Sequence, residues 1–421
     1  MKRDPNSDLA ATGGPGTSVT TADFPDDLRA SMERLRGAFI ELLQAMDDDT
    51  SLPQEMSRRY GINKNLSWKV CKIINAEDVS ASVQHVPGAA GIRILLDAYT
   101  RSGAPQAVVE GVSRAVDGFE QMIRTHVGDR ANLQLYVGST QPEGVHSEML
   151  EDKRRLAYQG NSAIWGVQAR LGFALRLIAP NAEQPERLDM VSCGGLMDFR
   201  RLRPNACWPV LQRRALGEGI DPTQSQRLPV DPTCGPDDAP LLKPFCSTPL
   251  PELRTVHEEA RVTYELREGP VGNTAALDIV FATIERAAVP IWGDDDDSVG
   301  EHYCQVDTPL EHAQFDLLVH RDLPFEAPGL VTYSRLHDEL KFPLSRQERY
   351  HLPGISEVED LGMSHHGLAT PHVREYARIV DLAAEAIGQP VEAFHKYRVS
   401  FAYPPMPTVL CMSHRLPQQP G

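Results

Sequence analysis

The chain has 421 residues, 41% of them hydrophobic, and carries a formal net charge of −16 at pH 7. Its length is sufficient for two or three domains, each with its own core. No segment approaches the run of about 20 apolar residues that a membrane helix needs. The acidic balance argues against a protein that coats nucleic acid over its whole surface, so any contact with nucleic acid must be local.

The first 24 residues mix Gly, Ser, Thr and Asp without an apolar segment, which predicts a disordered tail rather than a secretory signal. The chain has seven cysteines, an odd number, and no two of them have the spacing of a CxxC motif. This pattern favours reduced thiols over a disulfide framework. We therefore expect a cytoplasmic protein that does not contact a membrane.

Residues 28–46 place apolar side chains at steps of three and four. This spacing predicts an amphipathic helix. Asp47, Asp48 and Asp49 follow it. We interpret these acids as a solvated loop before the next helix, because a helix N-terminus favours negative charge.

Residues 51–75 have the pattern of two helices joined by a tight turn. Ser51 and Gln54 have the spacing of a capping box, and Pro53 suits a first helical turn. Gly61 is best able to adopt the left-handed conformation that ends a helix, and Asn63 is suited to cap the next one. The apolar residues of the second helix would share one face: Leu66, Val70, Ile73 and Ile74.

The opposite face of the second helix carries cations and an amide. Five cations against the single acid Glu55 give residues 51–75 a charge of +4, whereas the rest of the chain sums to −20. A cationic island on an acidic protein favours a polyanionic partner such as double-stranded DNA. The DNA-contacting residues predicted from this pattern are Arg58, Arg59, Lys64, Asn65, Ser67, Trp68, Lys69 and Lys72. Small helical hairpins with one basic face also occur as ordinary packing units, and this alternative stays open.

This region resembles the helix-turn-helix of prokaryotic transcription regulators. The small Ser57, the turn Gly61 and the following Ile62 stand where that class has a small residue, a glycine and an aliphatic residue. The resemblance implies a DNA-binding transcription regulator whose second helix enters the major groove. It covers the N-terminal region only, and the remaining chain resembles no specific family that we recognise.

Two further helices are expected before residue 130. The segment VPGAAG at 86–91 has glycines three apart, whereas a helix-hairpin-helix needs them two apart, so we expect a plain start to an apolar helix over 92–99. After a turn at 103–105, another amphipathic helix either completes the N-terminal core or provides a dimer seam; it runs through Val108, Val112, Val116, Phe119 and Ile123. We assign residues 25–130 to a helical helix-turn-helix DNA-binding domain.

From residue 141 the pattern becomes that of a β-rich domain. A helix over 143–159 precedes a strand over 167–177, whose apolar residues alternate with period two. After a hairpin connection at 181–187, a partner strand is expected over 188–202 with a bulge or turn at 193–195. Residues 217–251 are rich in proline, glycine and aspartate, which predicts a long loop.

Further short strands are expected at 261–267, 278–284, 314–320, 330–333 and 397–402, and one helix at 373–387. The predicted fold class is therefore α+β. A helical domain at 25–130 is followed by a larger β-rich domain at 141–421, with a few helices and the architecture of a sandwich or barrel.

No motif for catalysis, cofactor binding or metal binding is found in the sequence. Residues 320–323, HRDL, match the first letters of a protein-kinase catalytic loop, but Ala327 stands where the magnesium-binding asparagine is needed. Eight histidines lie between residues 302 and 372 without a recognised ligand spacing such as HxH or HExxH. We therefore predict no catalytic residue, no cofactor and no metal site.

The leading hypothesis is a DNA-binding transcription regulator whose β-rich domain senses a small-molecule effector or assembles the protein. The alternative is an enzyme or metal-binding protein with its site in the β-rich region, the N-terminal helices serving protein interaction. A third hypothesis is a pure assembly protein. We expect a homodimer on DNA, because a single reader helix makes few phosphate contacts and the acidic remainder repels the duplex.

Overall fold

The computed structural model describes residues 23–48, 52–76, 78, 81–140, 143–214, 227–235, 238–258, 261–295, 297–334, 351–352 and 357–419. The chain divides into two compact units, Met1–His146 and Ser147–Gly421. The first is helical and the second is built mainly of strands, so the predicted α+β class is confirmed. The tail expected at 1–24 lies outside the described residues up to residue 22, and the first helix begins at Phe24.

None of the helices in the described part of the chain combines the length and the apolar character that crossing a bilayer requires.

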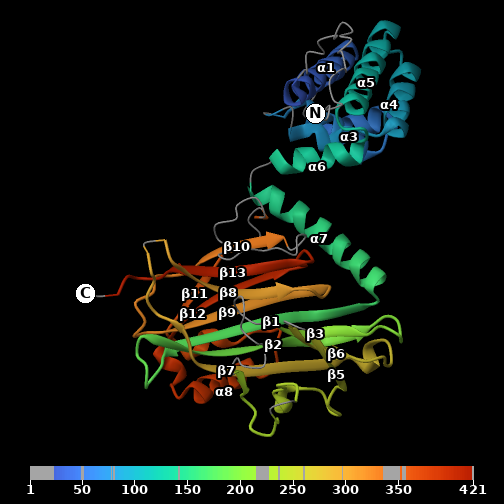
Figure 1. The fold of residues 1–421 in the computed structure, drawn as a ribbon. Coiled ribbons are helices and arrows are strands. Elements are labelled where there is room, and N and C mark those ends of the chain that lie inside the picture. The colour runs from blue at the N-terminus through green and yellow to red at the C-terminus, as the bar shows by residue number, and fades with distance from the viewer. Residues whose placement is uncertain are drawn as a thin grey trace, which may run out of the picture. The chain divides into compact units, whose positions relative to one another are not determined.

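Packed α-helices form the N-terminal unit (Figure 1). They are α1 (Phe24–Ala45), α2 (Pro53–Tyr60), α3 (Lys64–Ile74), α4 (Ala89–Arg101), α5 (Gln106–His126) and α6 (Arg130–Thr140), with the 3-10 helix η1 (Ala81–His85) between α3 and α4. α4 begins directly after Gly88, its N-cap residue, so the VPGAAG segment is a plain helix start, as the spacing of its glycines predicts.

The apolar stripes of α1 and α5 pack against each other in the N-terminal core. On α5 this stripe is buried within the unit: Val112, Phe119 and Ile123 are no more than 1% exposed. Of the two alternatives left open by the sequence, this helix therefore completes the core. Its apolar face is not available as a dimer seam.

The helical core extends past residue 130, where the sequence placed the end of the helical domain. Leu133 on α6 is 3% exposed and belongs to the same core. Arg130 donates from Nε to Glu120 Oε1 at 2.8 Å and from Nη1 to the Val86 carbonyl oxygen at 3.1 Å. α6 is therefore part of the N-terminal unit rather than a linker.

α7 (Glu143–Trp165) leads into the C-terminal unit. Its strands are β1 (Val167–Pro180), β2 (Arg187–Arg201), β3 (Trp208–Arg214), β4 (Arg227–Pro229), β5 (Leu253–Glu258), β6 (Arg261–Leu266), β7 (Leu277–Pro290), β8 (Val299–Val306), β9 (Leu310–His320), β10 (Gly329–Ser334), β11 (Glu359–Gly362), β12 (Phe394–Ala402) and β13 (Thr408–Arg415). Its helical elements are η2 (Lys243–Phe245), η3 (Asn273–Ala275), η6 (His365–Leu368), α8 (Tyr376–Ile387) and η7 (Val391–Ala393).

Seven strands form one large sheet in the order β11-β12-β9-β1-β2-β7-β4, in which only β1 and β9 pair in parallel. Two smaller sheets have the orders β10-β13-β8 and β3-β6-β5. α8 packs on one face of the large sheet against β1, β2 and β7. The other face shares a core with the two small sheets.

Alternation along β1 assigns its side chains to these two faces. Leu175 and Leu177 are fully buried in the core beneath α8, whereas Ala174 and Ile178 belong to the core shared with the small sheets. The residue between the two leucines, Arg176, therefore faces away from α8.

The bulge or turn predicted at 193–195 is wrong, because β2 pairs with β1 in continuous register through these residues. Glycine is needed at positions 194 and 195 for a different reason, because the backbones of the neighbouring strands approach closely there. A Cβ atom at Gly194 would lie 2.8 Å from the Phe173 carbonyl oxygen, and one at Gly195 would collide with the carbonyl oxygen of Ile279. The irregularities of β2 lie elsewhere, at 188–190 and 196–199 of its pairing with β7.

The five short strands predicted after residue 260 are confirmed as β6, β7, β9, β10 and β12, and the predicted helix is confirmed as α8. Strands β3, β4, β5, β8, β11 and β13 were not predicted. Part of the predicted loop at 217–251 lies outside the described residues, at 217–226 and 236–237. Its described part contains β4 and η2, which lie against β7.

Candidate nucleic-acid interface

α2 and α3 are joined by a tight turn over Gly61, Ile62 and Asn63. Gly61 has a φ of 65°, the left-handed conformation expected of it, and the Asn63 side chain accepts a hydrogen bond from Asn65 N at 2.8 Å. Ser57 Oγ donates to the Ile62 carbonyl oxygen at 2.7 Å, which ties α2 to the turn. The predicted roles of Gly61 and Asn63 are therefore confirmed, while Ser51 lies outside the described residues.

One face of α3 docks in the N-terminal core. Its apolar residues are no more than 9% exposed, as predicted from their spacing: Leu66, Val70, Ile73 and Ile74. Ser67 belongs to this face too, because it is fully buried and its Oγ donates to the Asn63 carbonyl oxygen at 3.4 Å. It lies one helical turn before the buried Cys71, so both point inward. The structure therefore removes Ser67 from the predicted DNA-contacting set.

The opposite face of α3 is basic and open to solvent. Lys64, Asn65 and Lys72 are exposed, and Lys69 is half-buried beside them. Among the residues that the structure describes, no acidic side chain forms an ion pair with any of these three lysines. The 11 residues of α3 extend over about 16 Å, which exceeds the roughly 12 Å width of a major groove.

Trp68 is 42% exposed on the same face and contacts η1. Its ring meets that of His85 edge to face at a centroid distance of 5.1 Å, and Lys72 Nζ lies 5.5 Å from the indole ring. Burial, reinforced by the charges of Lys72 and Lys69, lowers the pKa of His85. At neutral pH this imidazole is therefore an uncharged hydrogen-bonding group beside two cations.

The two arginines of α2 differ in whether a described acidic side chain pairs with them. Arg58 is exposed and forms no ion pair with any described residue. Arg59 is also exposed, but its Nη1 lies 2.8 Å from Asp48 Oδ1. Because Asp48 already compensates the charge of Arg59, we expect Arg58 to attract a phosphate more strongly than Arg59 does.

Asp48 corrects the expectation of a solvated acidic loop at 47–49. Its carboxylate accepts hydrogen bonds from Tyr60 Oη at 2.6 Å and Tyr99 Oη at 3.1 Å, and its side chain is only 6% exposed. Burial, together with this carboxylate, raises the pKa of both phenols, which therefore remain protonated donors. Asp48 thus links the end of α1 to α2 and α4, and Asp49 lies outside the described residues.

No family model matches the chain, and neither does any curated protein or solved structure. The case for a nucleic-acid interface on α2 and α3 is therefore made by its own residues and their geometry.

The C-terminal histidines include residues that the sequence left without a recognised ligand spacing. Within the described part of the chain, no group of three or more His, Cys, Asp or Glu side chains is arranged to hold a metal ion. His302 and His414 instead stack on each other with ring centroids 5.4 Å apart. Of the kinase-like residues 320–323, His320 is the last residue of β9 and the others lie in the turn that follows, where the Asp322 side chain is 72% exposed.

Proposed function

We propose that this chain is a cytoplasmic DNA-binding transcription regulator that inserts α3 into a major groove. The observation that carries this proposal is the division of α3 into a docked apolar face and an exposed face with unpaired lysines, an amide and an indole. A helix docked in this way presents its outer side chains to base edges while the preceding helix lies against the backbone.

The exposed residues divide into two roles. Lys64, Lys69 and Lys72 on α3, with Arg58 on α2, are placed to contact phosphates, which fix position and supply affinity without reading sequence. Asn65 is the candidate for sequence readout, because its amide can both accept from and donate to adenine in the major groove. Sequencing the DNA that remains bound to the purified full-length protein tests the proposal, and recovery of random fragments only would argue against a specific regulator.

We predict that the double variant Lys64→Ala, Lys69→Ala binds all DNA sequences more weakly and with a smaller salt dependence. Each lost phosphate contact should reduce the slope of log K against log [salt] by about 0.9. Asn65→Ala should instead leave the slope unchanged and reduce discrimination between target and random DNA.

A titration across salt concentrations measures both effects by fluorescence anisotropy. Arg93→Ala on α4 provides a control exposed cation outside the proposed interface. If both variants bind as the wild type does at every salt concentration, α3 is not the reader helix.

We propose further that the regulator binds DNA as a homodimer. A single reader of this kind binds non-specific DNA with a Kd of roughly 10⁻⁴ to 10⁻⁶ M at physiological salt. Two readers on a two-fold axis would double the contacts and address half-sites about one helical turn apart. Because the apolar face of α5 is used inside the N-terminal unit, we take an edge of the β-rich region as the candidate seam.

Light scattering of the free chain and of its complex with DNA tests this proposal. We expect two chains per duplex, with protection of two patches separated by one turn of the helix. A single chain on a duplex with one protected patch would contradict it.

A further inference from the structure

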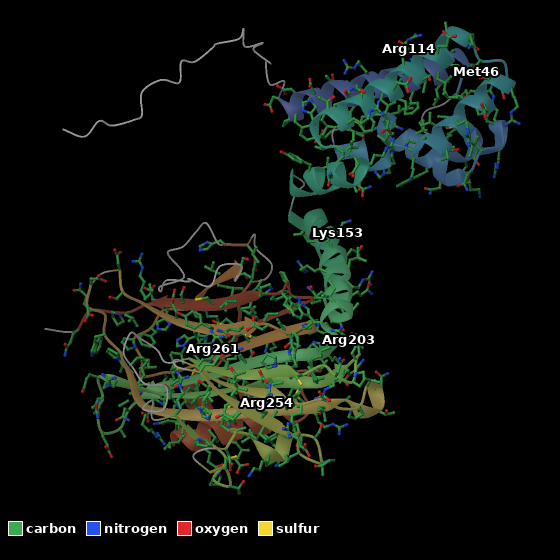
Figure 2. The ribbon with its side chains drawn as sticks, turned by 45° about the vertical axis from the view of Figure 1, so that its right-hand side comes forward. Met46, Arg114, Lys153, Arg203, Arg254 and Arg261 are labelled. Atoms are coloured by element: carbon green, nitrogen blue, oxygen red, sulfur yellow. The ribbon has the colours of Figure 1, made fainter. Side chains whose placement is uncertain are left out.

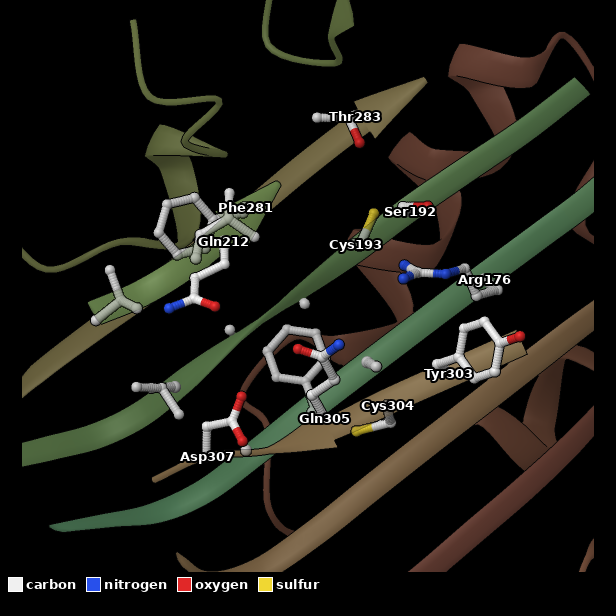
Figure 3. A pocket seen from close by; sticks show the side chains of 18 of the residues that line it. Arg176, Ser192, Cys193, Gln212, Phe281, Thr283, Tyr303, Cys304, Gln305 and Asp307 are labelled. Carbon is white, nitrogen blue, oxygen red and sulfur yellow. The ribbon is translucent and has the colours of Figure 1, made fainter. Parts of the chain in front are cut away.

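A hollow of about 390 Å³ opens on the face of the large sheet that lies opposite α8 (Figure 3). Its floor is formed by β1, β2 and β7, and residues of β3 and β8 line its sides. Small side chains on these paired strands leave the space of the hollow open: Ala174, Ser192, Gly194 and Thr283. Its volume lies in the range of roughly 300–1,000 Å³ that is typical of small-molecule sites.

Arg176 on β1 is one of the charged groups that line this hollow (Figure 3). Leu175 and Leu177 point beneath α8, so the alternation of the strand directs Arg176 to the opposite face. The guanidinium lies deep in the unit, and we ascribe the partial exposure of this side chain to the hollow that it lines. Within the described residues, no carboxylate forms an ion pair with it and no group accepts its hydrogen bonds.

The neighbours of Arg176 do not compensate its charge. Burial and the nearby Arg227 both lower the pKa of Arg176. The Glu285 carboxylate acts in the opposite direction, but it is already paired with Arg227 at 2.5 Å. Burial raises the pKa of the Cys193 and Cys304 thiols to about 12, so neither supplies a negative charge at neutral pH. A buried cation without a partner is costly, which points to a partner that arrives from solution.

The remaining lining suits a ligand with an anionic group and an organic body. Gln212 on β3 and Gln305 on β8 add amide donors and acceptors, and Phe281 on β7 adds an aromatic surface (Figure 3). The lining also contains acids: Glu301 accepts a hydrogen bond from Tyr303 Oη at 2.6 Å, and Asp307 is drawn at the far end of the hollow from Arg176 (Figure 3).

We propose that this hollow binds a small organic anion, a carboxylate or a phosphate ester, whose charged group accepts hydrogen bonds from Arg176 while its apolar body lies against Phe281. A planar guanidinium offers two parallel N–H donors to either group. The site lies within the C-terminal unit and rests on no part of the DNA-binding proposal. If that unit senses an effector, this chemistry defines the effector class.

The test uses the full-length protein and three probes of one shape: benzoate, phenyl phosphate and the neutral benzamide. Thermal unfolding is followed at constant ionic strength, because a ligand that binds the native state raises Tm in proportion to ln(1 + [L]/Kd). We expect benzoate or phenyl phosphate to raise Tm and benzamide to have no effect. The more effective of the two anions identifies the preferred charged group.

Arg176→Met separates binding from a structural role. We expect the variant to bind the effective anion about 10- to 100-fold more weakly, the range typical of a lost charged hydrogen bond. In the absence of ligand its Tm should equal or exceed that of the wild type, because an unpaired buried cation is removed. A purely structural Arg176 predicts a lower Tm.

Arg254→Met on β5 is the matched control, since this exposed arginine (Figure 2) pairs with Glu265 at the surface. Its response to the anions should equal that of the wild type. The proposal is overturned if neither anion raises Tm, if benzamide acts equally well, or if Arg176→Met retains the response.

Discussion

Arg398→Ala is expected to lower the free energy of unfolding of the C-terminal unit by about 3–5 kcal/mol. The reason is the position of Asp316, whose side chain is 1% exposed on β9 beneath α8. Removing the arginine leaves this carboxylate buried without a counter-charge. A loss of this size is a large part of the roughly 5–15 kcal/mol that stabilises an ordinary domain.

The geometry of the pair explains why no neighbour can replace Arg398. The guanidinium donates from Nε to Asp316 Oδ1 at 2.9 Å and from Nη2 to Oδ2 at 2.7 Å, and Tyr376 Oη donates to Oδ2 at 2.8 Å. Nη2 also donates to the Leu368 carbonyl oxygen at 3.2 Å. Arg398 therefore connects β12, β9 and the segment that precedes α8.

Urea titration followed by tryptophan fluorescence measures this loss, because Trp165, Trp208 and Trp292 lie in the C-terminal unit. Arg378→Ala is the control: this α8 arginine pairs with Glu375 at the surface, and we expect a change within about 0.5 kcal/mol. The double variant Asp316→Leu, Arg398→Met should recover most of the stability. A double variant no more stable than Arg398→Ala would show that the uncompensated charge is not the cause.

The sequence predicts those features whose causes lie within a few residues. The left-handed Gly61, the Asn63 cap and the docked face of α3 follow from helix-stop, capping and spacing signals inside one short segment. The alternation of apolar residues similarly predicts β1, which the structure extends to Val167–Pro180. Local signals are therefore sufficient to place α3 and its basic face.

Features that depend on distant residues were not predictable in this way. Asp48 is buried because Tyr99, 51 residues away in the chain, donates to it. Ser67 faces the core because that core is completed by other helices, and its own small polar side chain carries no signal of burial. From the sequence alone, Arg176 would be a solvent-facing residue of an amphipathic strand. In the structure, residues of β3 and β8 line the same face. In each case, contacts with residues distant in the chain give the side chain surroundings that differ from those its residue type suggests.

Acid is expected to destabilise the C-terminal unit through a pair of buried histidines. Burial lowers the pKa of His414 from 6.5 to about 4, and burial with the charges of His414 and Arg176 lowers the pKa of His302 as well. Nε2 of each ring has no hydrogen-bond partner within the described part of the chain. His414 also packs on the Phe325 ring at a centroid distance of 4.2 Å, in surroundings that do not favour a charged ring.

The sign of the effect follows from proton binding in the two states. Above pH 6.5 His414 is neutral both folded and unfolded, and it adds no pH dependence. Between pH 6.5 and about 4 the unfolded chain binds a proton that the native protein does not, so stability falls as the pH falls. The loss from His414 alone should reach roughly 3 kcal/mol by about pH 4, and His302 contributes in the same direction.

Urea titrations from pH 7 down to about pH 4 on the wild type and on His414→Phe isolate this contribution, since the carboxylates titrate in both proteins. Phenylalanine keeps an aromatic ring against Phe325 but cannot take up a proton. The readout is the slope of stability against pH, which is independent of any constant cost of the substitution. We expect the slope of the variant to be smaller between pH 6.5 and about 4, so that the two curves converge or cross as the pH falls. Parallel curves over this range would mean that His414 takes up its proton as readily in the native protein as in the unfolded chain.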